Sequence, residues 1–407
     1  MSKKRPQLRF EGFTDDWEEH KLGDFLKTPE KVKAHIQSKD DLMTLKLNLG
    51  GLESGSNRET LELGSTIYYK RKAGQFIYGK QNFFNGSMAI IPIDLDGKAT
   101  SGDVPSLDVI GILSEYLYVY VSRGDYWKSK ESEASGTGSK RIHEKTLQGF
   151  DIKVPSTQNE QRKIGSFFKQ LDDTIALHQR KLDLLKEQKK GYLQKMFPKA
   201  GEKIPELRFA GFADAWEERK FGEVIDSLYN GQTPSRANKA NWKGKINWLT
   251  SGELNRGTVT DTIEKITSVG QKDALLRIVP AGTFVIAITG LEAKGTRGNC
   301  AKLAIDTTLN QSCMAIFPNE KMLDTKFLFQ WYRKVGEEYG LRYTQGTKQQ
   351  SYNAELIKIL PITLPKLEEQ IKIADFLDQI DDTIALHQRK LDLLKEQKKG
   401  YLQKMFV

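Results

Sequence analysis

The chain of 407 residues contains two diverged copies of one arrangement, and this duplication restricts the folds open to it. An opening motif, PQLRFEGFTDDWEEHKLG, begins at Pro6, and PELRFAGFADAWEERKFG begins at Pro205, with 12 of 18 positions identical. A second segment of 26 residues, from Asp172 to Phe197, recurs without any change from Asp381 to Phe406. Because a long repeat indicates one structural unit used twice, the chain consists of opening motif, variable region and conserved segment, and then the same again.

The identical segments are predicted to form long helices that pair with each other. Their apolar residues recur at alternating steps of four and three, a period typical of a coiled coil. Thr157 and Glu160 have the spacing of a capping box at the start of the first helix, and Pro198 is expected to end it. The polar seam residues His178 and His387 are expected to fix the register rather than to act in catalysis. The predicted seam contains Leu171, Ile175, His178, Leu182 and Leu185 in the first copy and Ile380, Ile384, His387, Leu391 and Leu394 in the second.

The two variable regions, residues 26–150 and 225–360, mix short apolar runs with Gly, Pro, Asn and Asp, which predicts strands, turns and some helices. Two long helices in one chain can pair only if the chain loops back, which makes them antiparallel. The predicted fold is therefore α+β: two diverged mixed α/β domains, here called heads, joined by two long antiparallel coiled-coil helices in a pseudo-two-fold tandem repeat. The predicted boundaries are 1–152 for the first head, 153–198 for the central helix, 199–362 for the second head and 363–407 for the C-terminal helix.

Composition excludes several classes of protein. The chain has 63 Lys and Arg against 53 Asp and Glu, and a net charge of +10 is compatible with a polyanionic partner. No window approaches 18 uncharged apolar residues and no apolar stretch follows the basic start, so we expect a soluble, cytoplasmic protein without a membrane span. Cys300 and Cys313 have no CxxC neighbours and are expected to be core thiols. No histidine pair has metal-ligand spacing, so no metal site is predicted.

Motifs for catalysis are also missing from the sequence. There is no P-loop, no GxGxxG loop and no NPPY-like tetrapeptide of a DNA methyltransferase. Glu292 and Lys294 form an ExK pair, which is half of a nuclease motif, and no Pro-Asp element precedes them. We therefore predict no catalytic residues in this chain.

Glycine-flanked basic loops recur in both heads. SGTGSKRIHEKTL from Ser135 and TQGTKQQSYNAEL from Thr344 each precede a long helix, and further basic loops begin at Tyr68, Gly231 and Thr289. Exposed backbone N–H groups, hydroxyls and lysines suit phosphates, whereas Arg and Gln suit base edges. Each loop alone could be an ordinary solvated loop, and their joint occurrence favours nucleic acid. The predicted DNA-binding residues are Lys70, Arg71, Lys80, Lys140 and Arg141 in the first head and Arg236, Lys239, Lys294, Arg297, Lys348 and Gln349 in the second.

Taken together, these features resemble the DNA-specificity subunit of type I restriction-modification systems. The helical regions share the form P-x(3/4)-E-Q-x-K-I…F…D-D-T-I, here from Pro155 to Ile175 and from Pro365 to Ile384. The first head has GQFIYGK from Gly74, similar to one subclass of recognition domain. The second head has different landmarks of that family, which are Gly231-Gln-Thr-Pro-Ser, Trp248-Leu-Thr-Ser-Gly and Asn310-Gln311.

The resemblance implies a non-catalytic subunit that binds double-stranded DNA, with each head reading one half of a split site as a target-recognition domain. It also implies two copies of a modification subunit, which binds S-adenosylmethionine and methylates adenine. Restriction subunits would add translocation and cleavage with ATP and Mg. Two alternatives stay open: a stand-alone DNA-binding protein that dimerises through its helices, and an enzyme with an unrecognised nuclease site.

Overall fold

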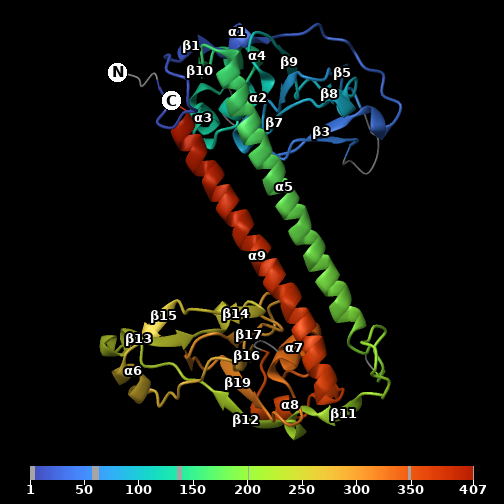
Figure 1. Ribbon diagram of the computed structural model, residues 1–407, viewed down its shortest axis with the longest axis vertical. Helices are drawn as coiled ribbons and strands as arrows, with labels where there is room; N and C mark the ends of the chain where they lie inside the picture. Colours follow the sequence, from blue (N-terminus) through green and yellow to red (C-terminus); the bar gives the residue numbers. More distant parts are fainter. Residues whose placement is uncertain (1–4, 57–63, 135–139, 200, 347–349, 407) are drawn as a thin grey trace. The chain divides into compact units, whose positions relative to one another are not determined.

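The computed structural model describes residues 5–56, 64–134, 140–199, 201–346 and 350–406, which form two compact units (Figure 1). One unit combines Met1–Gln179 with Arg389–Val407, and the other is Arg180–Gln388. Each unit contains one head and parts of both long helices, which are α5 (Gln158–Lys195) and α9 (Leu367–Met405). They have 38 and 39 residues and are the two long helices that the heptad pattern predicts.

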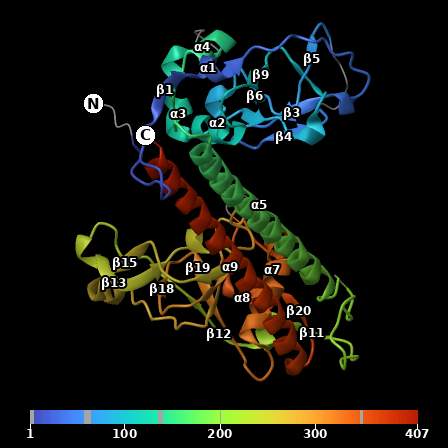
Figure 2. The ribbon, with the colours of Figure 1, turned by 45° about the horizontal axis from the view of Figure 1, so that its top comes forward.

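The first head contains a four-stranded antiparallel sheet with the order β2-β9-β6-β7. Its two central strands, β9 and β6, are labelled in Figure 2. Its strand β6 (Phe76–Tyr78) is wholly buried, which explains an unbroken apolar run instead of an alternating pattern. The other strands and the helices of this head are β2 (Leu26–Lys27), β3 (Met43–Leu45), β4 (Leu52–Ser54), β5 (Tyr68–Lys70), β7 (Met88–Ile90), β8 (Ala99–Ser101), β9 (Ser106–Val109), α1 (Leu22–Phe25), α2 (Ser114–Val121), α3 (Gly124–Ser129) and α4 (Glu144–Gln148).

The second head has a five-stranded mixed sheet with the order β12-β19-β16-β17-β14 and a three-stranded sheet with the order β15-β13-β18. Helix α7 (Thr325–Arg342) packs on β16 and β17 (Figure 1). The strands and remaining helices are β12 (Ile225–Asn230), β13 (Trp242–Leu249), β14 (Gly257–Val259), β15 (Glu264–Ile266), β16 (Phe284–Ala287), β17 (Cys300–Leu303), β18 (Thr308–Leu309), β19 (Cys313–Pro318), α6 (Ser268–Asp273) and α8 (Ala354–Lys358). The predicted mixed α/β content is therefore confirmed in both heads, although their sheets differ.

The opening motif closes both heads in the same way. Strand β1 (Glu18–Lys21) pairs antiparallel with β10 (Asp151–Val154), which leads into α5. In the second head β11 (Glu217–Lys220) pairs antiparallel with β20 (Pro361–Leu364), which leads into α9. Each copy of the motif thus ties the start of a head to the strand that enters the long helix.

An arginine of the same motif binds a buried glutamate in the first turn of each long helix. Arg9 donates to both carboxylate oxygens of Glu160 at 2.7 and 2.8 Å, and Arg208 binds Glu369 at the same two distances. This corrects part of the predicted capping box. The backbone N–H of Glu160 does donate to Thr157 Oγ1 at 3.3 Å, but the glutamate side chain turns to Arg9 because the buried carboxylate requires a cation.

Within each unit the two long helices run antiparallel. In the first unit Lys398 pairs with Asp172 at 2.5 Å, and the ring of Tyr401 lies 5.1 Å from that of Phe167. The residue number therefore rises along α9 as it decreases along α5. In the second unit Lys189 pairs with Asp381, and Tyr192 meets Phe376 at 4.9 Å. Of the predicted seam residues, Leu182 and Leu391 are 1% exposed. The others are half-buried, namely Leu171, Ile175, His178, Leu185, Ile380, Ile384, His387 and Leu394.

Candidate nucleic-acid interface

The basic loops of the second head lie at one end of the five-stranded sheet, where its strands begin or finish. Strands β12 and β16 end at this edge, whereas β19 and β17 begin there, because Asn230 pairs with Met314 and Ile286 pairs with Cys300. Strand β14 is parallel to β17 and begins there as well. The residues 231–236, 289–299 and 310–312 therefore lie together, and we call this set the loop edge.

The three landmarks of the second head meet at the loop edge. The N–H of Gln232 donates to Leu309 O at 3.0 Å, and the indole N–H of Trp248 donates to Gln232 O at 3.1 Å. Thr233 Oγ1 donates to the side-chain oxygen of Gln311. Gly231 is required here because a Cβ atom would lie 1.9 Å from Leu309 O. Close backbone packing thus presents the Thr233 and Gln311 side chains side by side.

Arg236 is held over an aromatic surface beside these residues. Its guanidinium lies 3.8 Å from the ring centroid of Trp242 and 5.1 Å from that of Trp248. It also binds both carboxylate oxygens of Glu264, at 2.6 and 2.8 Å. The group is exposed, but Glu264 occupies its planar fork, so a bidentate acceptor such as a guanine edge or a phosphate has to displace that carboxylate. The predicted residue Lys239 is exposed three residues further on.

The loop from Thr289 is fastened to the segment that precedes α8. The N–H of Leu291 donates to Gln350 O at 3.1 Å, and the N–H of Gln350 donates to Glu292 at 3.0 Å. Arg297 donates to the carbonyls of Leu291 and Glu292, so the structure gives it a role in shaping the loop, while Lys294 is exposed. The other two predicted residues here, Lys348 and Gln349, lie outside the described residues.

The first head brings together three of its predicted cations. The N–H of Ile142 donates to Lys80 O at 3.0 Å, which places Lys80 beside the segment carrying Lys140 and Arg141. Arg141 pairs with Asp103 at 3.1 Å, and Lys80 with Glu144 at 3.3 Å. Lys140 is exposed and pairs with Glu131 at 2.7 Å.

Arg71 differs from the prediction, and Lys70 lies on strand β5. The Arg71 side chain is 5% exposed and donates to Thr100 Oγ1 and to the carbonyls of Ser101 and Val104. Burial lowers the pKa of Arg71 to about 10. The guanidinium therefore supports the turn that carries Asp103 and does not present itself to DNA. Lys70 is exposed, and its strand pairs with β8.

Each long helix also carries two exposed leucines at equivalent positions. Leu177 and Leu184 of α5 are 59% and 58% exposed, and Leu386 and Leu393 of α9 are 60% and 57% exposed. A spacing of seven residues places each pair on one face of its helix. Leucines outside the seam offer the same apolar surface twice in one chain.

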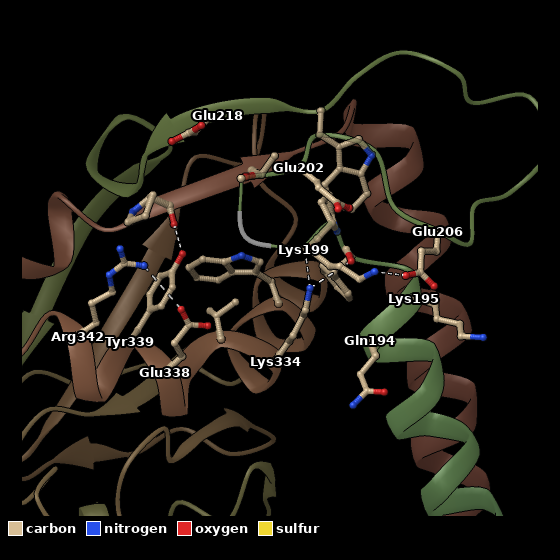
Figure 3. A pocket seen from close by; sticks show the side chains of 18 of the residues that line it. Gln194, Lys195, Lys199, Glu202, Glu206, Glu218, Lys334, Glu338, Tyr339 and Arg342 are labelled. Carbon is tan, nitrogen blue, oxygen red and sulfur yellow. Dashed lines mark hydrogen bonds and ion pairs between the residues drawn. The ribbon is translucent and has the colours of Figure 1, made fainter.

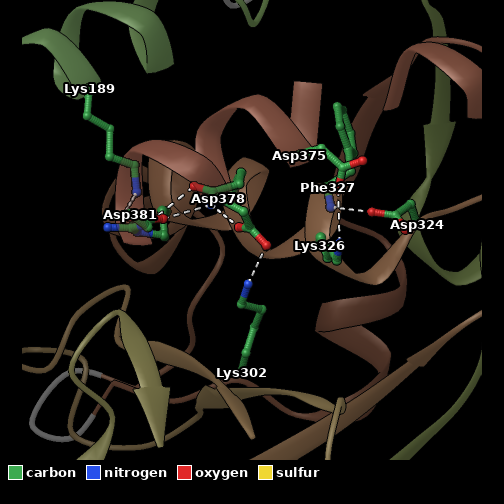
Figure 4. Close-up of polar contacts among 10 residues, drawn as sticks. Lys189, Lys302, Asp324, Lys326, Phe327, Asp375, Asp378 and Asp381 are labelled. Atoms are coloured by element: carbon green, nitrogen blue, oxygen red, sulfur yellow. Dashed lines mark hydrogen bonds and ion pairs between the residues drawn. The ribbon is translucent and has the colours of Figure 1, made fainter. Parts of the chain in front are cut away.

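A charged network anchors the helices of the second unit to its head (Figure 4). Asp381 accepts from Lys189, from Arg333 at 2.7 Å and from Gln330 at 3.0 Å. Burial, and then the neighbouring Arg333, lower the pKa of Lys189 to about 8. Although burial raises the pKa of Asp381, the two cations hold it below its usual value. Lys302 of β17 extends the network through an ion pair with Asp378.

A cavity of about 610 Å³ beside the end of α5 in the second unit is lined by charged side chains, several of which have partners inside the fold (Figure 3). Lys334 donates to the carbonyls of Phe197 and Pro198, and Lys199 pairs with Glu206. Among the described residues that line it there is no histidine or cysteine. These two cations therefore have acceptors within the protein.

The described residues contain no group of three or more His, Cys, Asp or Glu placed to hold a metal ion. Among them there is also no helix of the length and apolar character that crossing a membrane requires. Cys300 and Cys313 are buried as predicted, and burial raises the pKa of both thiols.

Sequence reasoning missed several residues that position the loops and the heads. Arg256, with a φ of 60°, donates to Arg297 O at 2.7 Å and fastens the loop from Thr289. No sequence pattern singles it out. For Arg9 and Arg208 a signal exists, because both occupy the same place in the duplicated opening motif.

The chain therefore belongs to a class of proteins with two different heads and two matching long helices. In each half, the same strand pairing joins the opening motif to the strand before the long helix. The family model for the type I restriction modification DNA specificity domain matches residues 14–187 and 213–396, one match for each copy. The chain belongs to this family.

Named relatives and solved structures agree with this assignment. The specificity subunit of the type I restriction enzyme MjaVIII of Methanocaldococcus jannaschii is 23% identical over 95% of this chain and 91% of its own length. That of EcoR124I/EcoR124II of Escherichia coli is 24% identical over 88% and 85%. The crystal structure of the S subunit of a type I system from M. genitalium shares the fold, with a TM-score of 0.65 and 13% identity over 99% of both chains. A chain from a study of complex assembly and conformational transition of the type I system gives a TM-score of 0.51 with 16% identity over 97% of this chain and 98% of that one.

Proposed function

We propose that this chain recognises a specific DNA sequence for a type I restriction-modification complex and does no chemistry itself. The observation that carries the proposal is the loop edge, where Thr233, Arg236 and Gln311 lie together at the end of one sheet. Hydroxyl, guanidinium and amide groups are those that read base edges, and nearby lysines suit phosphates. Family membership supports the same function.

The two heads read different halves of a bipartite site in this proposal. Their central sheets differ in strand number and order, so they present different loops to DNA. The long helices repeat 26 residues without change, which supports one partner bound twice. That partner is a modification subunit with S-adenosylmethionine, which methylates adenine. ATP and Mg belong to restriction subunits.

The test is a base-resolution map of methylated adenine in the source genome, with and without this gene. We expect a split motif with a fixed spacer to lose its methylation on deletion and to regain it when the gene is restored. Thr233 and Gln311 both belong to the second head. Restoring the gene with Thr233→Ala and Gln311→Ala is therefore expected to weaken methylation in a way that depends only on the sequence of one half-site. An unchanged map, together with a purified complex that binds no DNA, would contradict the proposal.

Methylation that persists while the isolated chain still binds DNA as a dimer would favour the stand-alone DNA-binding protein. Metal-dependent cleavage by the purified chain would favour a nuclease, and Glu292→Gln would then abolish the cleavage. Both outcomes are distinct from the loss of a split motif.

A further inference from the structure

Leu275 in the second head combines an exposed apolar side chain with a strained backbone. At 90% it is the most exposed large apolar residue among those the structure describes, and its φ is +49°. A leucine in the left-handed region costs free energy, because its Cβ crowds the following carbonyl and it has no polar group to compensate. Leu275 follows the C-cap of α6, where the N–H of Leu276 donates to Gln271 O at 2.9 Å and where glycine is the usual residue.

The flanking residues hold this segment rigidly. Leu276 is 5% exposed and belongs to a small core with Trp248 and Ile266. The N–H of Arg277 donates to Tyr229 Oη at 3.1 Å, and its guanidinium lies 4.8 Å from the Tyr229 ring centroid. The Leu275 side chain therefore projects from a fixed base.

Leu275 lies next to the loop edge. Two residues before it, the Asp273 carboxylate accepts from Ser235 N at 3.4 Å and from Asn241 Nδ2 at 2.8 Å. Further on, Val279 bridges Thr307 in an antiparallel manner. Because the two segments are antiparallel, Leu275 lies on the side of Val279 toward which β18 runs. That side carries Asn310 and the loop edge.

Cations outnumber carboxylates around Leu275, where the nearby acidic groups are Asp273 and the Glu264 that pairs with Arg236. Lys272 and Arg277 are exposed on either side of it, and Arg236 and Lys239 belong to the loop that Asp273 contacts. An apolar side chain between cations suits DNA, because phosphates bind the cations while the apolar group enters a groove.

We propose that Leu275 is a wedge that enters the DNA groove and partly unstacks one base step when the second head binds. Apolar side chains act in this way in proteins that kink a duplex. The contact deepens the DNA-recognition function proposed above and depends on it. Unstacking adds selectivity without a hydrogen bond, because flexible pyrimidine–purine steps deform at lower cost than other steps.

The experiment uses the full-length chain with its modification partner, and duplexes in which 2-aminopurine is placed in turn at each step in and beside the half-site of the second head. The natural chain is expected to raise the fluorescence at one step. Leu275→Gly and Leu275→Asn both tolerate a positive φ and lack the wedge, so we expect the increase to fall at least about fivefold without loss of thermal stability. Leu275→Met keeps an apolar side chain and should keep most of the signal.

Ile359→Asn is the matched control, since Ile359 is 55% exposed in the same unit but follows α8, away from the loop edge. It should leave the fluorescence unchanged. A complex that binds its site without any unstacked step, or Leu275 variants that keep the full signal, would overturn the wedge but not DNA recognition. Variants that lose the modification subunit and keep the signal would show that Leu275 contacts protein instead. Failure of the natural complex to bind DNA would overturn both proposals.

Discussion

The same aspartate–lysine pair occurs in both units, and its surroundings set its contribution to stability. The side chains of Lys189 and Asp381 are 5% and 28% exposed, whereas those of Lys398 and Asp172 are 28% and 41% exposed. Asp381→Asn removes the carboxylate that Lys189 and Arg333 share, so we expect the free energy of unfolding to fall by about 2–3 kcal/mol. Asp172→Asn removes a more exposed pair and should cost less than about 1 kcal/mol.

Amide hydrogen exchange checks this prediction, because it reports on α7 separately from the first unit. Lys189→Met is the control: Asp381 keeps Arg333, so exchange in α7 should rise less than in Asp381→Asn. Equal effects of Asp381→Asn and Asp172→Asn would show that the head contributes nothing to the network.

Residue types in the candidate site could be predicted from the sequence, but their burial could not. Arg71 and Arg236 both stand in basic loops with aromatic neighbours, yet one is buried under a turn and the other lies exposed over Trp242. The difference depends on strand pairings between residues far apart in the chain, which no local pattern reveals. Leu275 cannot be predicted as a site residue, because an exposed leucine has no sequence signature.

Among the elements, the long helices are the best predicted, because heptad spacing is a local signal that extends over many turns. The sheets are not predictable in this way. Strand β13 pairs with β15 nearby in the chain and also with β18, about sixty residues away (Trp248 with Thr308). The loop edge exists only because such distant pairings align the strand ends.

The exposed leucine pairs lead to a prediction about partner number. Replacing Leu177 and Leu184 by Glu should remove one bound modification subunit, and the same change at Leu386 and Leu393 should remove the other, because charged groups exclude an apolar partner surface. Native mass spectrometry of the complex measures the stoichiometry. Ala176→Glu with Ala385→Glu adds the same kind of charge one residue away on each helix and should leave both partners bound. Loss of both partners from either leucine pair alone would contradict independent sites.

At the scale of the whole molecule, the two heads have diverged, whereas the long helices share an identical segment. The heads differ in their sheets and loops, while the helices and the closing strands keep the same contacts, such as Phe406 and Phe197 each 6.0 Å from the tryptophan of an opening motif. A chain that must bind one partner twice and two DNA sequences once each would show this division. The bases themselves cannot be predicted, because a loop defines a sequence only through its contact geometry.

If helices of fixed length separate the two half-sites, then lengthening both should lengthen the unread spacer. One added heptad in α5 and in α9 keeps the seam in register and extends each helix by about 10 Å, or about three base pairs. The methylation map should then show the same two half-sites with a spacer longer by about three base pairs. A heptad added to α5 alone has no matching turns in α9 and should reduce methylation at every site. An unchanged spacer in the double insertion would mean that the heads, and not the helices, set the distance.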